Sequence, residues 1–195
     1  MLRKLYDWTM GLASGPRAPW ALSAVSFIES SIFPIPPDAL LVPMVIARRN
    51  KAWFYATLCT IASVIGGLLG YAIGAFLFDQ VAEPILAFYG YAEKFASFTN
   101  QYNEWGVWIV LIAGLTPFPY KVITIASGAT GLSLPVFMLA SIAARGARFF
   151  IVSALLYWLG PPIKDFIEKR LGLVFTLALV LLIGGFVVAK YLIPH

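Results

Sequence analysis

The chain has 195 residues, of which 61% are hydrophobic and 12% are charged, and its formal net charge is +5. Soluble domains contain about 45–50% apolar and about 25% charged residues, so this composition excludes a soluble globular protein, a disordered chain and a nucleic-acid-binding protein. Long uninterrupted apolar runs also argue against a β-barrel, whose strands alternate apolar and polar residues. We therefore expect an all-α integral membrane protein, in which basic residues report the topology.

The first 78 residues predict a surface helix, a broken hairpin and a span. Apolar residues recur at helical spacing in residues 1–18, which predicts an interfacial N-terminal helix. In residues 19–78, the prolines Pro34, Pro36 and Pro37 separate two apolar arms that are each shorter than the roughly 20 residues needed to cross a bilayer. Because proline lacks an N–H and clashes with the preceding turn, the helix breaks there. We predict a re-entrant hairpin followed by a transmembrane helix.

The remaining residues predict a second copy of this pattern between two further helices. Residues 79–105 have an aromatic stripe opposite a polar face, which indicates an interfacial helix or, as the alternative, a helix packed on the protein's own core. Residues 106–160 form the second repeat, in which Pro117 and Pro119 break the hairpin before another span. Residues 171–194 predict a C-terminal transmembrane helix.

The distribution of basic residues predicts how the repeats are oriented. With the N-terminus in the cytoplasm, nine basic residues outside the apolar segments lie inside and two lie outside, as the positive-inside rule requires. A shift of 83 positions aligns Pro34 with Pro117 and Pro36 with Pro119. Because one span separates the two halves, they face opposite ways, and we expect an inverted repeat of the kind common in transporters.

Five ionisable residues lie inside apolar segments, where an Asp, Lys or Arg costs about 2.5–3.5 kcal/mol at a helix centre. They are Glu29, Asp38, Lys121, Arg145 and Arg148. Their sum is one positive charge, and the planar fork of arginine suits phosphate, so we interpret them as a binding site for an anion.

Each of these residues also has a structural interpretation. Asp38 can stabilise the start of a helix, Glu29 can pair with an arginine, and Lys121 can lie at the membrane surface. Arg145 and Arg148 can bind backbone carbonyls that the prolines leave without a donor.

Other motifs are structural or absent. Gly66, Gly70 and Gly74 recur every four residues, which predicts close helix packing. Neither a metal-ligand cluster nor a cofactor motif nor a nucleophile–base pair is visible in the sequence, so we expect no metal, no cofactor and no enzymatic activity.

Together, the turn from Pro34 to Asp38, the glycine stripe ending at Gly74 and the break from Pro117 to Lys121 resemble the DedA family, which shares the VTT or SNARE-associated domain. The segment from Arg145 to Phe149 is most similar to the YqaA-like branch. This resemblance implies a bacterial inner-membrane protein that moves phospholipid or polyprenyl phosphate carriers between leaflets, with proton coupling in some members. It also implies that the family's acidic pair corresponds to Glu29 and Asp38, and that its second-half arginine corresponds to Lys121.

Three functions remain open at this point. The first is a transporter or scramblase that acts on a lipid with a phosphate head group. The second is a proton- or cation-coupled transporter of a small solute, and the third is a non-transporting membrane organiser or assembly factor. The sequence leaves open the identity of the head group and whether the protein forms a homo-oligomer.

Overall fold

The computed structural model describes residues 17–31, 36–116 and 118–169, and within these ranges every regular element is helical. The expected N-terminal interfacial helix, apart from its last two residues, and the expected C-terminal span over residues 171–194 lie outside the described residues. Pro34 and Pro117 also lie outside them.

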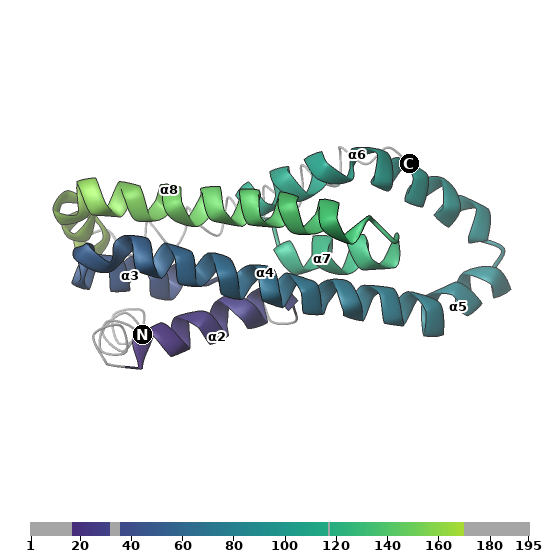
Figure 1. The fold of residues 1–195 in the computed structure, drawn as a ribbon, viewed down its shortest axis with the longest axis horizontal. Helices are drawn as coiled ribbons and strands as arrows, with labels where there is room; N and C mark the ends of the chain where they lie inside the picture. The colour runs from purple at the N-terminus through teal and green to yellow at the C-terminus, as the bar shows by residue number, and fades with distance from the viewer. Residues whose placement is uncertain (1–16, 32–35, 117, 170–195) are drawn as a thin grey trace.

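The first half consists of two short helices and one long helix. Helix α2 spans Ala18–Ser31 and α3 spans Asp38–Ala47, so the helical chain is interrupted around the first proline group. A 3-10 turn, η1 (Arg49–Lys51), then leads into α4 (Ala52–Leu77). In Figure 1, α2 runs from the end of the molecule that holds the N-terminal label towards its middle.

The second half begins with a short continuation of the long helix. Five residues adopt a π-helix, η2 (Phe78–Ala82), and α5 (Glu83–Phe88) follows. The chain reverses at Gly90, whose positive φ of 71° favours glycine. Helix α6 (Ala92–Leu115), α7 (Tyr120–Ala129) and α8 (Leu134–Lys169) complete the described fold.

Two helix boundaries differ from those expected. The segment 79–105 is not a separate helix, because α6 continues without interruption to Leu115. The reversal occurs at Gly90, where the backbone conformation favours a turn, whereas Gly106 lies inside α6 and packs against Leu132.

The second difference is at the end of the second repeat. Helix α8 runs past Gly160, where we expected a span to end, and through two successive prolines to Lys169. Pro161 has no N–H to donate to the Tyr157 carbonyl, and the Arg49 guanidinium donates to that carbonyl instead. A partner from another helix therefore helps α8 to tolerate the proline.

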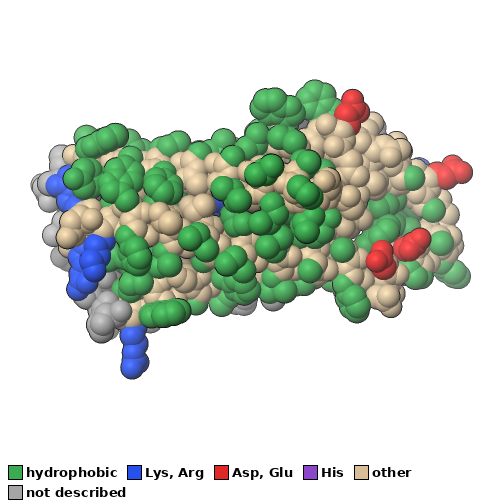
Figure 2. All heavy atoms as spheres, viewed as in Figure 1, with side chains coloured by type: hydrophobic (Ala, Val, Ile, Leu, Met, Phe, Trp, Pro, Cys, Tyr) green, Lys and Arg blue, Asp and Glu red, His purple; other side chains and the backbone are tan. Residues whose placement is uncertain are grey.

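Among the residues that the structure describes, two helical segments are long and apolar enough to cross a membrane, Arg49–Phe88 and Leu134–Gly160. At a rise of about 1.5 Å per residue, the 26 residues of α4 alone extend about 39 Å, more than the roughly 30 Å hydrocarbon core of a bilayer. Lys and Arg side chains gather at one end of the molecule and Asp and Glu side chains at the other, with apolar side chains between them (Figure 2).

The two halves pack on each other reciprocally. Helix α2 packs on α4 and α6 packs on α8, while α3 crosses to α8 and α7 crosses to α4. Glycines on α4 permit these close contacts: a Cβ at Gly66 would overlap the backbone of Phe27, and one at Gly74 would overlap the backbone of Ile125. The glycines of α4 therefore pack against α2 from the first half and against α7 from the second.

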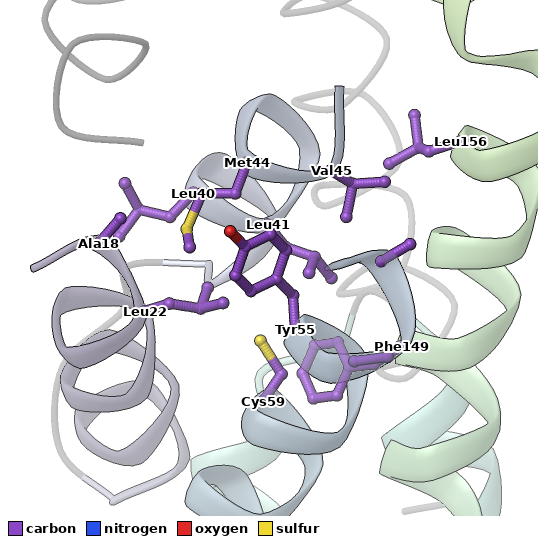
Figure 3. Packing of buried hydrophobic residues seen from close by; sticks show 12 residues of the cluster. Ala18, Leu22, Leu40, Leu41, Met44, Val45, Tyr55, Cys59, Phe149 and Leu156 are labelled. Carbon is purple, nitrogen blue, oxygen red and sulfur yellow. The ribbon is translucent and has the colours of Figure 1, made fainter. Parts of the chain in front are cut away.

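Two apolar clusters support this arrangement. The first joins α2, α3 and α4 to α8 and includes Leu22, Leu41, Tyr55 and Phe149 (Figure 3). The second joins α6, α7 and α8 and includes Tyr120 and other fully or largely buried side chains, among them Val110 and Phe137. The Arg145 guanidinium lies between the two clusters, over the ring of Phe149 in the first and the ring of Tyr120 in the second.

Candidate functional site

The site combines the ends of short helices with the middle of α8. Glu29 lies in the last turn of α2, and Asp38 is the first residue of α3. Arg145 and Arg148 are three residues apart on α8 and therefore share one face. Arg145 is 11 residues after Leu134, so it lies about 16 Å along a helix whose apolar part extends about 40 Å.

Arg145 completes a closed ring of hydrogen bonds. Its Nη2 donates to Glu29 Oε2 at 2.7 Å, and its Nε donates to Ser63 Oγ at 2.6 Å. Ser63 Oγ lies 2.6 Å from Ser30 Oγ, which contacts the same Glu29 oxygen at 3.2 Å. Three helices, α2, α4 and α8, are thus joined by one polar network that includes one ion pair.

This guanidinium is enclosed by aromatic rings. The Arg145 side chain is 1% exposed, and its Cζ lies 4.8 Å from the ring centre of Tyr120 and 4.7 Å from that of Phe149. The Tyr120 hydroxyl in turn donates to Ser141. Because a buried charge is costly without partners, the carboxylate, the hydroxyl and the two π faces together account for its stability.

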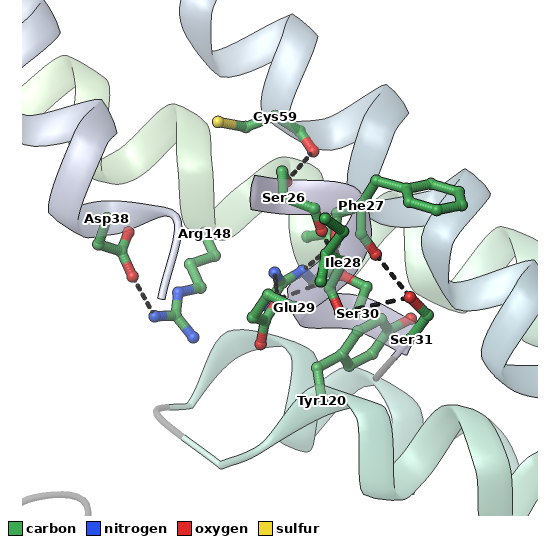
Figure 4. Close-up of polar contacts among 12 residues, drawn as sticks. Ser26, Phe27, Ile28, Glu29, Ser30, Ser31, Asp38, Cys59, Tyr120 and Arg148 are labelled. Carbon is green, nitrogen blue, oxygen red and sulfur yellow. Dashed lines mark hydrogen bonds and ion pairs between the residues drawn. The ribbon is translucent and has the colours of Figure 1, made fainter. Parts of the chain in front are cut away.

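Arg148 joins the two proline breaks. Its Nη2 donates to Asp38 Oδ2 at 2.5 Å, directly after the first break, and its Nη1 donates to the Thr116 carbonyl at 2.8 Å, directly before the second. Figure 4 shows the Arg148 guanidinium beside Asp38, separate from the network around Glu29 and Ser30. The two side chains of this ion pair are 19% and 26% exposed, so it is more accessible than the Arg145 pair.

Hydroxyl groups bind carbonyls near the breaks. Pro34 has no N–H to donate to the Ser30 carbonyl four residues earlier, and Thr124 Oγ1 of α7 donates to that carbonyl at 3.1 Å. Pro117 likewise leaves the Ala113 carbonyl without its helical donor, and Thr116 Oγ1 donates to it at 3.4 Å. The end of α2 is therefore bonded directly to the helix that follows the other break.

Of the five charges predicted from sequence, the structure pairs Arg145 with Glu29 and Arg148 with Asp38. Lys121 lies half-buried in the first turn of α7, next to Tyr120. Pro36 and Pro37 immediately precede α3, and Pro119 immediately precedes α7.

Sequence reasoning missed the hydroxyl residues of the site, Ser30, Ser63, Thr116 and Thr124. A signal was available in α2, because Ser26 and Ser30 are four residues apart in an apolar segment and therefore share a face. Both side chains are fully buried, and Ser26 Oγ donates to the Cys59 carbonyl of α4 at 2.8 Å.

The described residues contain no group of three or more His, Cys, Asp or Glu residues placed to hold a metal ion. Both carboxylates of the site are paired with arginine. The chemistry that these side chains offer is the exchange of one anionic partner of an arginine for another.

Comparison with known proteins identifies the family. The model of the VTT domain matches residues 35–158, which include both arginines, Asp38 and Lys121. An uncharacterized protein from Haemophilus influenzae is 37% identical over 186 residues, which are 95% of this chain and 96% of that protein. An uncharacterized protein from Histophilus somni is 36% identical over 165 residues, 85% of this chain and 84% of that protein. No solved structure matches the chain.

The domain match covers well over half of the chain, which therefore belongs to the VTT-domain, or DedA, family of membrane proteins.

Proposed function

We propose that the protein moves a lipid with a phosphate head group between the leaflets of a bacterial inner membrane, as a transporter or scramblase. The observation that carries the proposal is a pair of arginine–carboxylate contacts near the middle of α8, one of which also joins the chain on either side of the two proline breaks. A charged residue inside a membrane segment is expensive and most often functional. The five charges of this region add up to one positive charge, which favours an anionic ligand.

The two ion pairs support a stepwise exchange. A head-group phosphate reaches the more exposed Arg148 first and replaces Asp38, because phosphate presents two oxygens to the arginine fork. It then competes with Glu29 for Arg145 in the enclosed part of the site. A proton taken up by the displaced carboxylate removes an unpaired negative charge, and this step provides the proton coupling that we include in the proposal.

The reciprocal packing supports an inverted repeat of two re-entrant hairpins. Helix α2 packs on α4 as α6 packs on α8, and α3 crosses to α8 as α7 crosses to α4. Helix α2 enters from one end of the molecule and α6 from the other (Figure 1). We therefore propose that each hairpin enters and leaves on its own side of the membrane, with the N-terminal hairpin on the cytoplasmic side.

The test is leaflet exchange of a labelled phospholipid or polyprenyl phosphate in liposomes that contain the purified full chain. Wild-type protein is expected to accelerate exchange, and Arg148→Gln is expected to abolish it. Arg148→Lys is expected to restore exchange only in part, because an ammonium group lacks the planar fork. Arg17→Gln removes the same charge from an exposed residue away from the ion pairs and serves as the matched control.

Two results would contradict the proposal in different ways. If wild-type protein does not accelerate exchange above empty liposomes for any of several anionic lipids and pH values, lipid movement is wrong. Uptake of a small solute would then favour the solute transporter, and its absence would favour the organiser. Exchange that persists in Arg148→Gln and Arg145→Gln would retain lipid movement and exclude these ion pairs as its site.

A further inference from the structure

A second polar site lies at the basic end of the molecule, far along α8 from the ion pairs. An open surface cavity of about 360 Å³ is lined by Arg49 and Asn50, which precede α4, and by Tyr157 and Trp158 of α8. Trp158 is ten residues after Arg148, which is about 15 Å along the helix. The cavity shares no residue with the network around Arg145.

Arg49 is held in this cavity by the backbone of α8. Its Nη2 donates to the Tyr157 carbonyl, and its Cζ lies 5.7 Å from the centre of the Tyr157 ring. Its Nε is buried and donates to no residue that the structure describes. A guanidinium has five N–H donors, so the backbone contact fixes its position and leaves other donors for a ligand.

The segment of the chain that contains Arg49 is basic. Arg48 and Lys51 are its near neighbours, and both are exposed. The sequence has no acidic residue between Asp38 and Asp79, so no carboxylate within α4 or its leading turn competes for the guanidinium. The side chain of Asn50 is exposed and lines the cavity with a neutral amide, which can donate two further hydrogen bonds.

The aromatic residues around this cavity are of the kinds found at the depth of lipid head groups. Trp158 is 69% exposed, and Trp53 lies 5.9 Å from the Tyr157 ring and 6.0 Å from the Phe150 ring. Tryptophan and tyrosine concentrate at membrane–water interfaces because one side of each ring system is apolar and the other carries a donor. This end of the molecule is also basic, and anionic lipids of the cytoplasmic leaflet attract basic residues.

We propose that this cavity binds the phosphate of a phospholipid from the adjacent leaflet. Arg49 and Asn50 donate to the phosphate oxygens, and Trp158 packs against the apolar part of the same lipid. The site does not depend on lipid movement through the ion pairs, so it is retained even if the protein does not transport lipid.

The experiment measures binding of phosphatidylglycerol to the purified, delipidated full chain by native mass spectrometry. Arg49→Gln is expected to weaken binding about tenfold or more, because it removes the charged donor to the phosphate. Asn50→Leu and Trp158→Leu, which leave the Arg49–Tyr157 contact in place, are each expected to weaken it several-fold. Arg17→Gln, an exposed residue with the same charge change, is expected to leave the affinity unchanged within about twofold.

The source of the phosphate is tested by competition. Inorganic phosphate at millimolar concentration is expected not to displace the lipid, because it lacks the apolar part that contacts Trp158. Displacement by inorganic phosphate would overturn the lipid assignment. The site itself is wrong if Arg49→Gln and Asn50→Leu both bind phosphatidylglycerol as the wild type does, or if Arg17→Gln weakens binding as much as Arg49→Gln does. If Arg49→Gln fails to fold, Asn50→Leu and Trp158→Leu decide between these results.

Discussion

The two arginines of α8 illustrate how position changes the role of one residue type. Arg145 is 1% exposed and contacts a carboxylate, a hydroxyl and two aromatic rings, whereas the Arg148 side chain is 19% exposed and contacts a carboxylate and a carbonyl. Breaking an enclosed ion pair leaves a buried charge, while breaking a partly hydrated pair leaves a charge that water can solvate. We therefore expect Arg145 to determine folding as well as function, and Arg148 to affect function more than folding.

Removal of either partner of the enclosed pair is predicted to destabilise the protein. Glu29→Leu and Arg145→Leu each leave the other charge buried, and each is expected to cost about 3–5 kcal/mol. The double variant removes both charges and is expected to recover most of this loss. Thermal unfolding of the detergent-purified variants checks the prediction. Single variants as stable as the wild type, or a double variant with fully additive losses, would show that the pair is not coupled.

At the level of helices, the fold depends on close approach along one face of α4. Gly66 contacts the backbone of α2 and Gly74 contacts the backbone of α7, so one helix holds a segment from each half. Backbone cannot move aside as the end of a flexible side chain can, and larger residues at these glycines must therefore separate the helices. The same contacts place Thr124 against the Ser30 carbonyl, which connects the two breaks.

Adding a single methyl group at Gly74 tests whether glycine is required there for close helix packing, because helix propensity by itself favours alanine. A Cβ at Gly74 would overlap the backbone of Ile125, so Gly74→Ala is expected to destabilise the protein by about 1–3 kcal/mol. Gly146→Ala is the matched control, because its nearest new neighbour would be Thr60 Cγ2 at 3.7 Å, an ordinary contact. Alanine is favoured over glycine in helices by about 1 kcal/mol, so this control is expected to be neutral or stabilising. Equal unfolding temperatures for the two variants would contradict the packing argument.

For the whole molecule, the separation of charge predicts an orientation in the membrane. Arg17 precedes α2, and Arg48, Arg49 and Lys51 follow α3, whereas Asp79 lies in η2 just after α4, Glu83 in α5, and Glu93 and Glu104 in α6. In Figure 2, Lys and Arg side chains gather at one end of the molecule and Asp and Glu side chains at the other. Because basic residues are retained in the cytoplasm, we propose that the start of α4 faces the cytoplasm.

Two exposed asparagines at opposite ends provide a matched test of this topology. In a Cys59→Ser background, Asn100→Cys is expected to react with a membrane-impermeant thiol reagent applied to intact cells, and Asn50→Cys is not. Both positions are expected to react after permeabilisation, which controls for accessibility. Labelling of position 50 but not of position 100 in intact cells would reverse the proposed orientation.

Composition and local chemistry determined the class of the protein and the positions of its breaks. Apolar content indicated a membrane protein, and long uninterrupted apolar runs favoured helices over the alternating strands of a barrel, the other structure that satisfies its backbone groups in lipid. Interruptions near Pro36 and Pro119 followed from the missing N–H of proline, a property that needs no tertiary contact. The five ionisable residues inside apolar segments could also be identified from the sequence, since each interrupts an apolar run.

Only the tertiary structure decided which groups meet and which helices continue. Arg145 pairs with Glu29, which is 116 positions away in the sequence, and Arg148 pairs with Asp38, which is 110 positions away. The local spacing of residues along the chain does not specify such distant pairs. Helix α8 passes through Pro161 while Arg49, 108 positions before Tyr157, donates to the carbonyl that this proline leaves without a donor. The chain reverses at Gly90, and α6 then begins at Ala92 and continues past position 105 to Leu115. A proline determines where a donor is lost, but only packing determines which distant residue replaces it.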